Sequence, residues 1–166
     1  RVAVTPMTKP GVEPHDLELT PKDVAALASS DLVVYLAGFQ PAVDDAVAST
    51  APDAGFDVAP FARLTITAAD DGMTMAGGAH GGAAPAREEE EHDEEAEEHE
   101  GEGGLDPHFW RDPTRYAEVA EAIRDQLTTV DPDGAAEYTA NATAFVAELD
   151  RIDGEFMTGL ETCTHR

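Results

Sequence analysis

Residues 31–37, with the sequence DLVVYLA, form a nearly continuous apolar run that is rich in β-branched side chains. Such a run is typical of a parallel strand that is covered on both faces, because neither side of the strand can then remain polar. Gly38 ends the run, and Pro41 opens a helical pattern that has one apolar side. The run therefore limits the chain to folds in which helices pack on both faces of a sheet.

Further strands and helices are predicted on either side of this run. Residues 1–6 alternate enough to predict a short strand, and residues 56–61 predict a third one. A helix is expected to begin at Thr20, where proline follows the cap and Asp23 lies three residues after it. The order strand, helix, strand, helix, strand predicts right-handed crossovers and an α/β fold with a doubly wound parallel sheet.

The charge of the chain excludes several kinds of partner. The formal net charge is −25 over 166 residues, which argues against binding to nucleic acid and to anionic membranes, since both need a basic face. The sequence has no run of 18 apolar residues and no signal peptide, and it opens within a predicted strand and not with Met. We therefore expect a trimmed or processed piece, for which a missing export signal says little about location.

Residues 70–104 are of low complexity and consist mainly of acidic residues, glycine, alanine and histidine. Burial of so few apolar groups cannot offset the entropy of ordering the segment, which predicts a disordered insertion. It contains His80, His92 and His99. These side chains are candidate weak ligands that raise the local concentration of a metal ion, and the alternative is that they belong only to a solvated acidic tether.

Two other histidines, His15 and His108, occur in matching surroundings. Each follows a proline directly and has an acidic residue nearby, Asp16 or Asp106, that is suited to orient the imidazole ring. Ligands of parallel sheets bind beyond the carboxyl ends of the strands, and both histidines are expected on loops at that edge. Neutral imidazole suits zinc, copper, nickel and iron. The pair predicts a metal site, and the alternative is two loop histidines with local hydrogen bonds alone.

The C-terminal part of the chain is predicted to be helical. Asp112 and Pro113 are an N-cap followed by proline at the first helical position, and residues 116–127 then have amphipathic spacing. A second apolar stripe runs through residues 131–160, which corresponds to a helix of about 40 Å. A helix of that length exceeds what a small sheet needs to cover it, so we interpret it as a strut.

Motifs of catalysis and calcium binding are missing from the sequence. It contains no H-E-x-x-H, no G-x-S-x-G and no D-x-[DN]-x-[DN]-G loop. The only cysteine, Cys163, can form no disulfide within the chain. We therefore expect a binding protein and not an enzyme.

Taken together, these segments resemble the zinc-binding and other metal-binding substrate-binding proteins of bacterial ABC importers. The segments that match are PGVEPHDLELTPKD, SSDLVVYLAGFQPAVD, the histidine-rich acidic insertion, and DPHFWRDP with its helix. The resemblance implies two similar α/β lobes that are joined by one long rigid helix, with the metal in the cleft between them. By this resemblance residues 1–130 are the first lobe, residues 131–161 are the connecting helix, and the second lobe is absent from this chain.

The resemblance also implies the ligands and the role. His15 and His108 become the first lobe's metal ligands, and a third histidine and a carboxylate or water come from beyond the connecting helix. Pro14 and Gln40 stand where some relatives have acidic residues, so no ligand is carried over to these positions. The implied function is to capture extracytoplasmic Zn²⁺, as the transported ligand, and to deliver it to the membrane permease of an ABC transporter. The protein is expected to be monomeric and either periplasmic or lipid-anchored.

Three alternatives remain open from the sequence. A manganese- or iron-binding protein of the same transporter family would take more carboxylate ligands from the other lobe. A zinc hydrolase would need an open coordination position and a general base beside the metal. An acidic interaction module would use residues 70–104 as its functional part.

Overall fold

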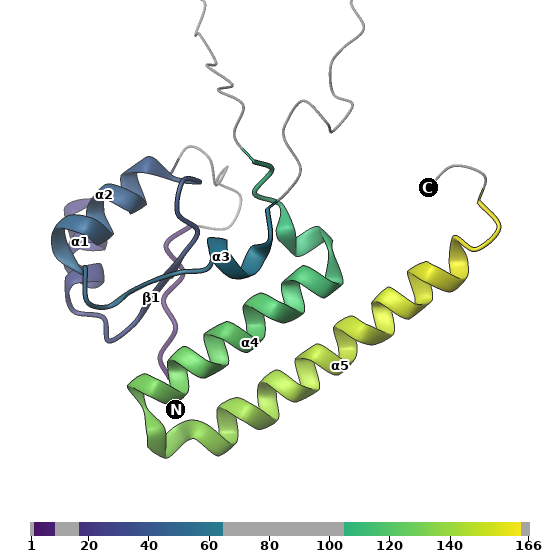
Figure 1. Cartoon of the computed structure of the whole chain (residues 1–166). Helices are drawn as coiled ribbons and strands as arrows, with labels where there is room; N and C mark the ends of the chain where they lie inside the picture. Colours follow the sequence, from purple (N-terminus) through teal and green to yellow (C-terminus); the bar gives the residue numbers. More distant parts are fainter. Residues whose placement is uncertain (1, 9–16, 65–104, 164–166) are drawn as a thin grey trace, which may run out of the picture. The chain divides into compact units, whose positions relative to one another are not determined.

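The chain forms a small α/β lobe in a computed structural model that describes residues 2–8, 17–64 and 105–163 (Figure 1). Its described sheet consists of two parallel strands, β1 (Val33–Tyr35) and β2 (Gly55–Asp57). Val33 pairs with Gly55 and Tyr35 with Asp57. The parallel pairing predicted from the strand and helix order is therefore confirmed for these two strands.

Helices α1 (Pro21–Ala28) and α2 (Pro41–Thr50) pack together against one face of the sheet. The predicted start of α1 is confirmed: the Thr20 hydroxyl accepts a hydrogen bond from the Asp23 amide at 3.3 Å, and the Asp23 carboxylate accepts one from the Thr20 amide at 2.9 Å. The buried side chains between these helices and β1 are Leu27, Val33, Val43, Ala46, Val47 and Ala51.

The opposite face of the sheet is covered by α3 (Ala59–Ala62) and α4 (Pro113–Val130). The buried side chains there are Val58, Ala62 and Val119, with Leu36, Phe56, Leu64, Phe109 and Ile123 packed around them. In Figure 1, α1 and α2 lie on one side of β1 and α4 lies on the other. Helices on both faces of a parallel sheet define an α/β lobe.

The strand predicted over residues 56–61 is wrong beyond Asp57. The Asp57 side chain accepts hydrogen bonds from the amides of Ala37 and Ala59, at 3.0 and 2.8 Å. Asp57 thus links the residues that follow β1 to the start of α3. Pro60 has no amide hydrogen to extend a strand ladder. The chain turns into α3 at this point instead.

The strand predicted at residues 1–6 is also wrong for the described residues 2–6, which have no strand assignment. Val2 and Val4 have exposed fractions of 48% and 83%. A segment becomes a strand only when a neighbour pairs with its amides and carbonyls, and these residues lie across a cavity from β1.

β1 is shorter than the predicted run over residues 31–37. Val34 is 42% exposed, so the face of the strand on which Val34 lies is not fully covered.

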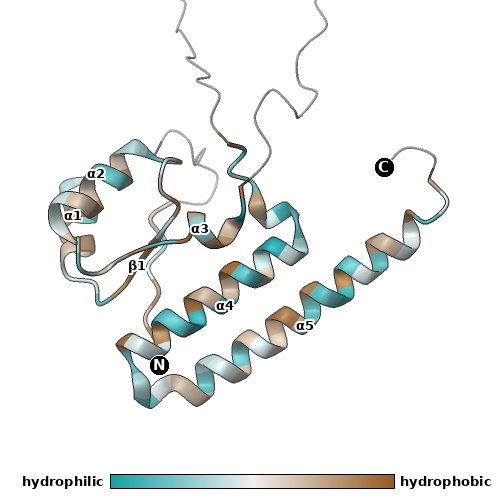
Figure 2. Cartoon of the chain, in the orientation of Figure 1, coloured by the Kyte–Doolittle hydropathy of each residue, from teal (hydrophilic) through white to brown (hydrophobic). Residues whose placement is uncertain are grey.

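Helix α5 (Ala135–Gly159) follows the short 3₁₀ helix η3 (Pro132–Gly134) and packs along α4. The predicted long helix is thus present, although it begins after η3 and not at residue 131. α5 has 25 residues and α4 has 18. The last turns of α5 therefore extend past the end of α4. Figure 2 shows that these last turns also contain apolar residues.

The apolar stripe predicted along α5 is buried only in part. Tyr138 and Leu149 are buried, whereas Phe145, Phe156 and Leu160 are 40%, 61% and 47% exposed. Within the described ranges, none of the helices combines the length and the hydropathy that a membrane span needs.

Candidate metal centre

His108 lies half-buried at the start of the 3₁₀ helix η2 (Phe109–Arg111). Two local hydrogen bonds hold the main chain around it: the Phe109 amide donates to the Pro107 carbonyl at 2.8 Å, and the Arg111 amide donates to the His108 carbonyl at 3.1 Å. A ligand on a short loop that is already ordered loses little conformational freedom when it binds an ion.

The loop of His108 leads directly into α4 through its N-cap, Asp112. The Asp112 Oδ1 atom accepts hydrogen bonds from the amides of Thr114 and Arg115, at 2.9 and 3.3 Å, and from the Thr114 hydroxyl at 2.7 Å. The predicted cap at Asp112 and Pro113 is therefore confirmed. Burial acts to raise the pKa of Asp112, but these hydrogen bonds and the charge of Arg115 outweigh it and lower that pKa.

A chain of aromatic rings connects His108 to the carboxyl end of β1. The His108 and Trp110 ring centroids lie 5.1 Å apart in an edge-on arrangement, and Trp110 lies 6.3 Å from Phe39. Phe39 belongs to the turn that follows β1, while Phe109 packs edge-on against both Trp110 and Tyr116. His108 is thus held at the edge of the sheet where parallel α/β proteins bind their ligands.

The turn after β1 depends on Gly38 and Asp44. Gly38 has a φ of 79°, which favours glycine, and its amide donates to Asp44 Oδ2 at 2.9 Å. Asp44 Oδ1 is buried, and the described residues provide no hydrogen-bond donor for it. Sequence reasoning missed Phe39 and Asp44, although an aromatic residue directly after the strand-ending Gly38 and an acidic residue six positions after it were the available signals.

The other predicted ligands are not part of the described structure. His15, with its neighbours Pro14 and Asp16, lies outside the described residues, as do His80, His92 and His99. Within residues 2–8, 17–64 and 105–163, no three side chains of histidine, cysteine, aspartate or glutamate gather in a group suited to a metal ion. The described part of the chain therefore contributes one predicted ligand, His108.

Comparisons with known proteins agree on one family. The model of "Zinc-uptake complex component A periplasmic" matches residues 1–166. The chain is 29% identical over 160 residues to the zinc-binding protein AdcA of Streptococcus pyogenes serotype M3, which is 95% of this chain and 29% of that protein. It is 30% identical over 155 residues to the manganese-binding lipoprotein MntA of Halalkalibacterium halodurans, which is 92% of this chain and 41% of that protein.

A solved structure shows the same fold. The crystal structure of Zn(II)-bound AdcA from Streptococcus pneumoniae matches with a TM-score of 0.63 and 22% sequence identity, over 94% of this chain and 27% of that chain. The chain thus spans well under half the length of the relatives it matches. The family match, which covers every residue, shows that this chain belongs to the family of the periplasmic zinc-uptake complex component A.

Proposed function

We propose that this chain is the first lobe and connecting helix of the extracytoplasmic substrate-binding component of a zinc ABC importer. The component captures Zn²⁺ in a cleft between two lobes and delivers the ion to a membrane permease. The observation that carries this proposal is the family match over residues 1–166. The name of the zinc-binding AdcA relative supports zinc as the ion.

His15 and His108 are the proposed ligands from this lobe. The proposal is supported by the ordered loop around His108 and by the contact of His108 with Trp110, which packs on Phe39 beyond the carboxyl end of β1. The sheet of the lobe is proposed to be doubly wound, which brings the loop that carries His15 to the same edge. Zn²⁺ binds neutral imidazole, so its affinity falls when acid protonates the ligands.

The helical part after residue 130 is the proposed connection to a second lobe. In this arrangement residues 1–130 form the first lobe, residues 131–161 connect the lobes, and the second lobe contributes a further histidine and a carboxylate or water. The greater length of the relatives supports this division. The exposed apolar side chains of Phe156, near the end of α5, and of Leu160, its C-cap, would be covered by the proposed second lobe.

The insertion at residues 70–104 is proposed to assist capture without forming the main site. His80, His92 and His99 lie among carboxylates in the sequence, and such a segment binds metal weakly and raises its concentration nearby. The main site is therefore expected to keep its affinity when the insertion is removed.

The protein is proposed to work outside the cytoplasm as a monomer, either in the periplasm or on a lipid anchor. The family description names the periplasm, and the Streptococcus pneumoniae relative is named a zinc-binding lipoprotein. The partner is the permease of the same transporter.

Manganese is the second candidate ion. The observation that favours it is the 30% identity to the manganese-binding lipoprotein MntA. Imidazole suits Zn²⁺, whereas Mn²⁺ prefers carboxylate and carbonyl oxygens. Competition titrations of the full-length protein with both ions separate the two candidates.

Titration calorimetry of the full-length protein tests the zinc proposal. We expect His15→Ala and His108→Ala each to weaken Zn²⁺ binding at least about 100-fold, because the loss of one ligand leaves the ion incompletely coordinated. Deletion of residues 72–103 and His99→Ala are the matched controls, and both are expected to leave the tight site nearly unchanged. Unchanged affinity in either of the first two variants would refute the ligand assignment.

A further inference from the structure

Trp110 is the only tryptophan in the sequence, and it lies two positions after His108. Its side chain is 42% exposed and belongs to neither of the two buried apolar clusters. Its indole instead contacts other rings edge-on, with centroid distances of 5.1 Å to His108, 5.4 Å to Phe109 and 6.3 Å to Phe39. The indole therefore bridges two loops at the edge of the sheet and contributes little to the core.

Two of these neighbours are themselves anchored to the fold. Phe109 packs against the buried cluster that contains Val119. Phe39 belongs to the turn after β1, in which Asp44 accepts a hydrogen bond from a main-chain amide at 2.9 Å. Trp110 thus lies between a ring that packs on the core and a ring on a hydrogen-bonded turn. Its position is determined from two sides, and edge-on contacts of this kind favour a defined geometry.

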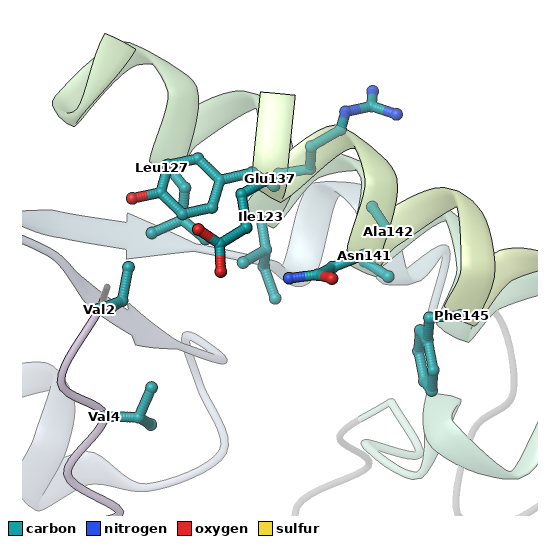
Figure 3. Close-up of a pocket in the computed structure, with 11 residues that line it drawn as sticks. Val2, Val4, Ile123, Leu127, Glu137, Asn141, Ala142 and Phe145 are labelled. Atoms are coloured by element: carbon teal, nitrogen blue, oxygen red, sulfur yellow. The ribbon is translucent and has the colours of Figure 1, made fainter. Parts of the chain in front are cut away.

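The row of rings also continues from Phe109 in the direction away from His108. Phe109 meets Tyr116 of α4 at 6.0 Å, and Tyr116 meets Phe145 of α5 at 5.2 Å, both edge-on. Phe145 is 40% exposed and lines a cavity of about 490 Å³ beside α5 (Figure 3). Phe109 and Tyr116 therefore separate Phe145 from Trp110. Phe145 has nearly the same exposure as Trp110, so it offers a matched comparison within the same row.

The hydrogen bonds of the loop order the main chain at His108 but do not fix its imidazole. They join the amides of Phe109 and Arg111 to the carbonyls of Pro107 and His108. A histidine side chain has three staggered wells at χ1 and a roughly twofold χ2, which gives about six orientations of the ring. When only one orientation can bind an ion, the apparent affinity falls with the fraction of molecules that hold the ring in it. A fixed neighbour of the imidazole therefore contributes to affinity.

We propose that Trp110 is a positioning residue for His108: its indole, held between Phe39 and Phe109, keeps the imidazole in one orientation before the ion arrives. This inference rests on the proposed function, because it takes His108 as a ligand of Zn²⁺. The indole nitrogen is only a hydrogen-bond donor, so Trp110 acts through His108 and not as a ligand. Without the indole the imidazole samples roughly three to six orientations, and the apparent Kd for Zn²⁺ rises by the same factor.

Titration calorimetry of the full-length protein measures this factor. We expect Trp110→Ala to raise the Kd for Zn²⁺ roughly three- to sixfold. Trp110→Phe keeps an aromatic ring at the position and is expected to restore the Kd to within about twofold of the unmodified protein. Phe145→Leu is the matched control and should leave the Kd unchanged. Circular dichroism checks that each variant is folded at the temperature of the titration.

Nuclear magnetic resonance of the metal-free full-length protein gives a readout that needs no ion. The ring resonances of His108 are assigned by their loss in His108→Ala. We expect nuclear Overhauser effects between these protons and the indole of Trp110. In Phe39→Leu the indole loses a support, so the His108 resonances should move toward those of an exposed histidine. In Phe145→Leu they should stay in place.

The results separate this proposal from the ligand assignment. Unchanged Zn²⁺ affinity in His108→Ala would refute the ligand assignment and, with it, the role of Trp110. If His108→Ala loses tight binding while Trp110→Ala binds like the unmodified protein, His108 is a ligand but Trp110 does not position it. A weaker affinity of Trp110→Ala that Trp110→Phe does not restore, or His108 resonances that Phe39→Leu leaves unchanged, would also overturn the proposal.

Discussion

Replacement of Asp112 by alanine tests how α4 supports the loop of His108. The Asp112 side chain accepts three hydrogen bonds from Thr114 and Arg115 and lies 3.1 Å from the Arg115 guanidinium. Loss of an N-cap costs about 1 kcal/mol, and loss of a negative charge at a helix N-terminus costs about 0.5 kcal/mol. Because the carboxylate is 43% exposed, water replaces part of what is lost. We therefore expect a cost of about 1 kcal/mol, less than the sum of these two contributions, or a decrease in Tm of roughly 4 °C.

Asp112→Asn is the matched control, because asparagine caps as well as aspartate does and removes only the charge. Thermal unfolding followed by circular dichroism should show a decrease of only about 2 °C for this variant. If both variants unfold at the same temperature, or if Asp112→Ala unfolds like the unmodified chain, the hydrogen bonds of Asp112 do not stabilise α4 as argued.

The pH dependence of the unfolding free energy, compared between the unmodified chain and Asp112→Asn, gives a second check. The pKa of Asp112 is lowered in the folded state, so its contribution to stability is complete above the pKa of the unfolded state, about 3.9. The contribution is lost as the pH falls through the lower folded pKa. The difference in unfolding free energy between the unmodified chain and Asp112→Asn is therefore expected to shrink below about pH 4. A difference that grows in acid would contradict the sign of this shift.

Four further substitutions are followed by chemical denaturation. Val119→Ala is expected to lower the free energy of unfolding by about 2 kcal/mol, because Val119 of α4 is only 2% exposed where α4 packs on the sheet. Val130→Ala is the matched control. Val130 is 42% exposed, so this change should lower the free energy of unfolding by less than about 0.5 kcal/mol. Gly55→Ala should lower the free energy of unfolding by about 1–3 kcal/mol, because the new Cβ would lie 2.6 Å from Val47 Cγ1. An unchanged free energy of unfolding would show that α2 moves aside at little cost. Gly154→Ala should stabilise α5 by about 0.5–1 kcal/mol, since no described atom beyond the surrounding helix backbone lies within 4 Å of the new Cβ. A loss of stability would mean that α5 has a close neighbour there.

Local rules predicted the helix starts well, because the groups that determine them are close in the sequence. Thr20 and Asp23 form the expected capping box, and Asp112 caps α4 as expected. The same holds for the apolar side of α2, where Val43, Ala46 and Val47 are buried. Caps and amphipathic faces depend on residues within one or two turns, so a single sequence contains the information they need.

Strand boundaries were predicted less well, because a strand depends on partners that are distant in the sequence. The alternation in residues 2–6 predicts a strand correctly only when a neighbouring strand is present, and none pairs with this segment among the described residues. At the other end of the sheet, the Asp57 side chain and Pro60 divert the chain into α3. Periodicity alone does not reveal either effect.

The candidate site was predicted in part. The Pro-His context and the following cap indicated that His108 stands on an ordered loop, and the structure describes such a loop. The contact of Trp110 with Phe39 could not be derived from spacing, because 71 positions separate two rings that meet only in the folded chain. The pairing of His15 with His108 stays a prediction, since His15 lies outside the described residues.

The central claim is that one zinc ion is bound by both His15 and His108. A crystal structure of the zinc-loaded full-length protein, with anomalous data collected at the zinc absorption edge, tests it most directly. We predict one strong anomalous peak about 2.0–2.1 Å from a ring nitrogen of each of the two histidines. A zinc peak that only one of these rings contacts, or a peak held by His80, His92 or His99 alone, would contradict the account.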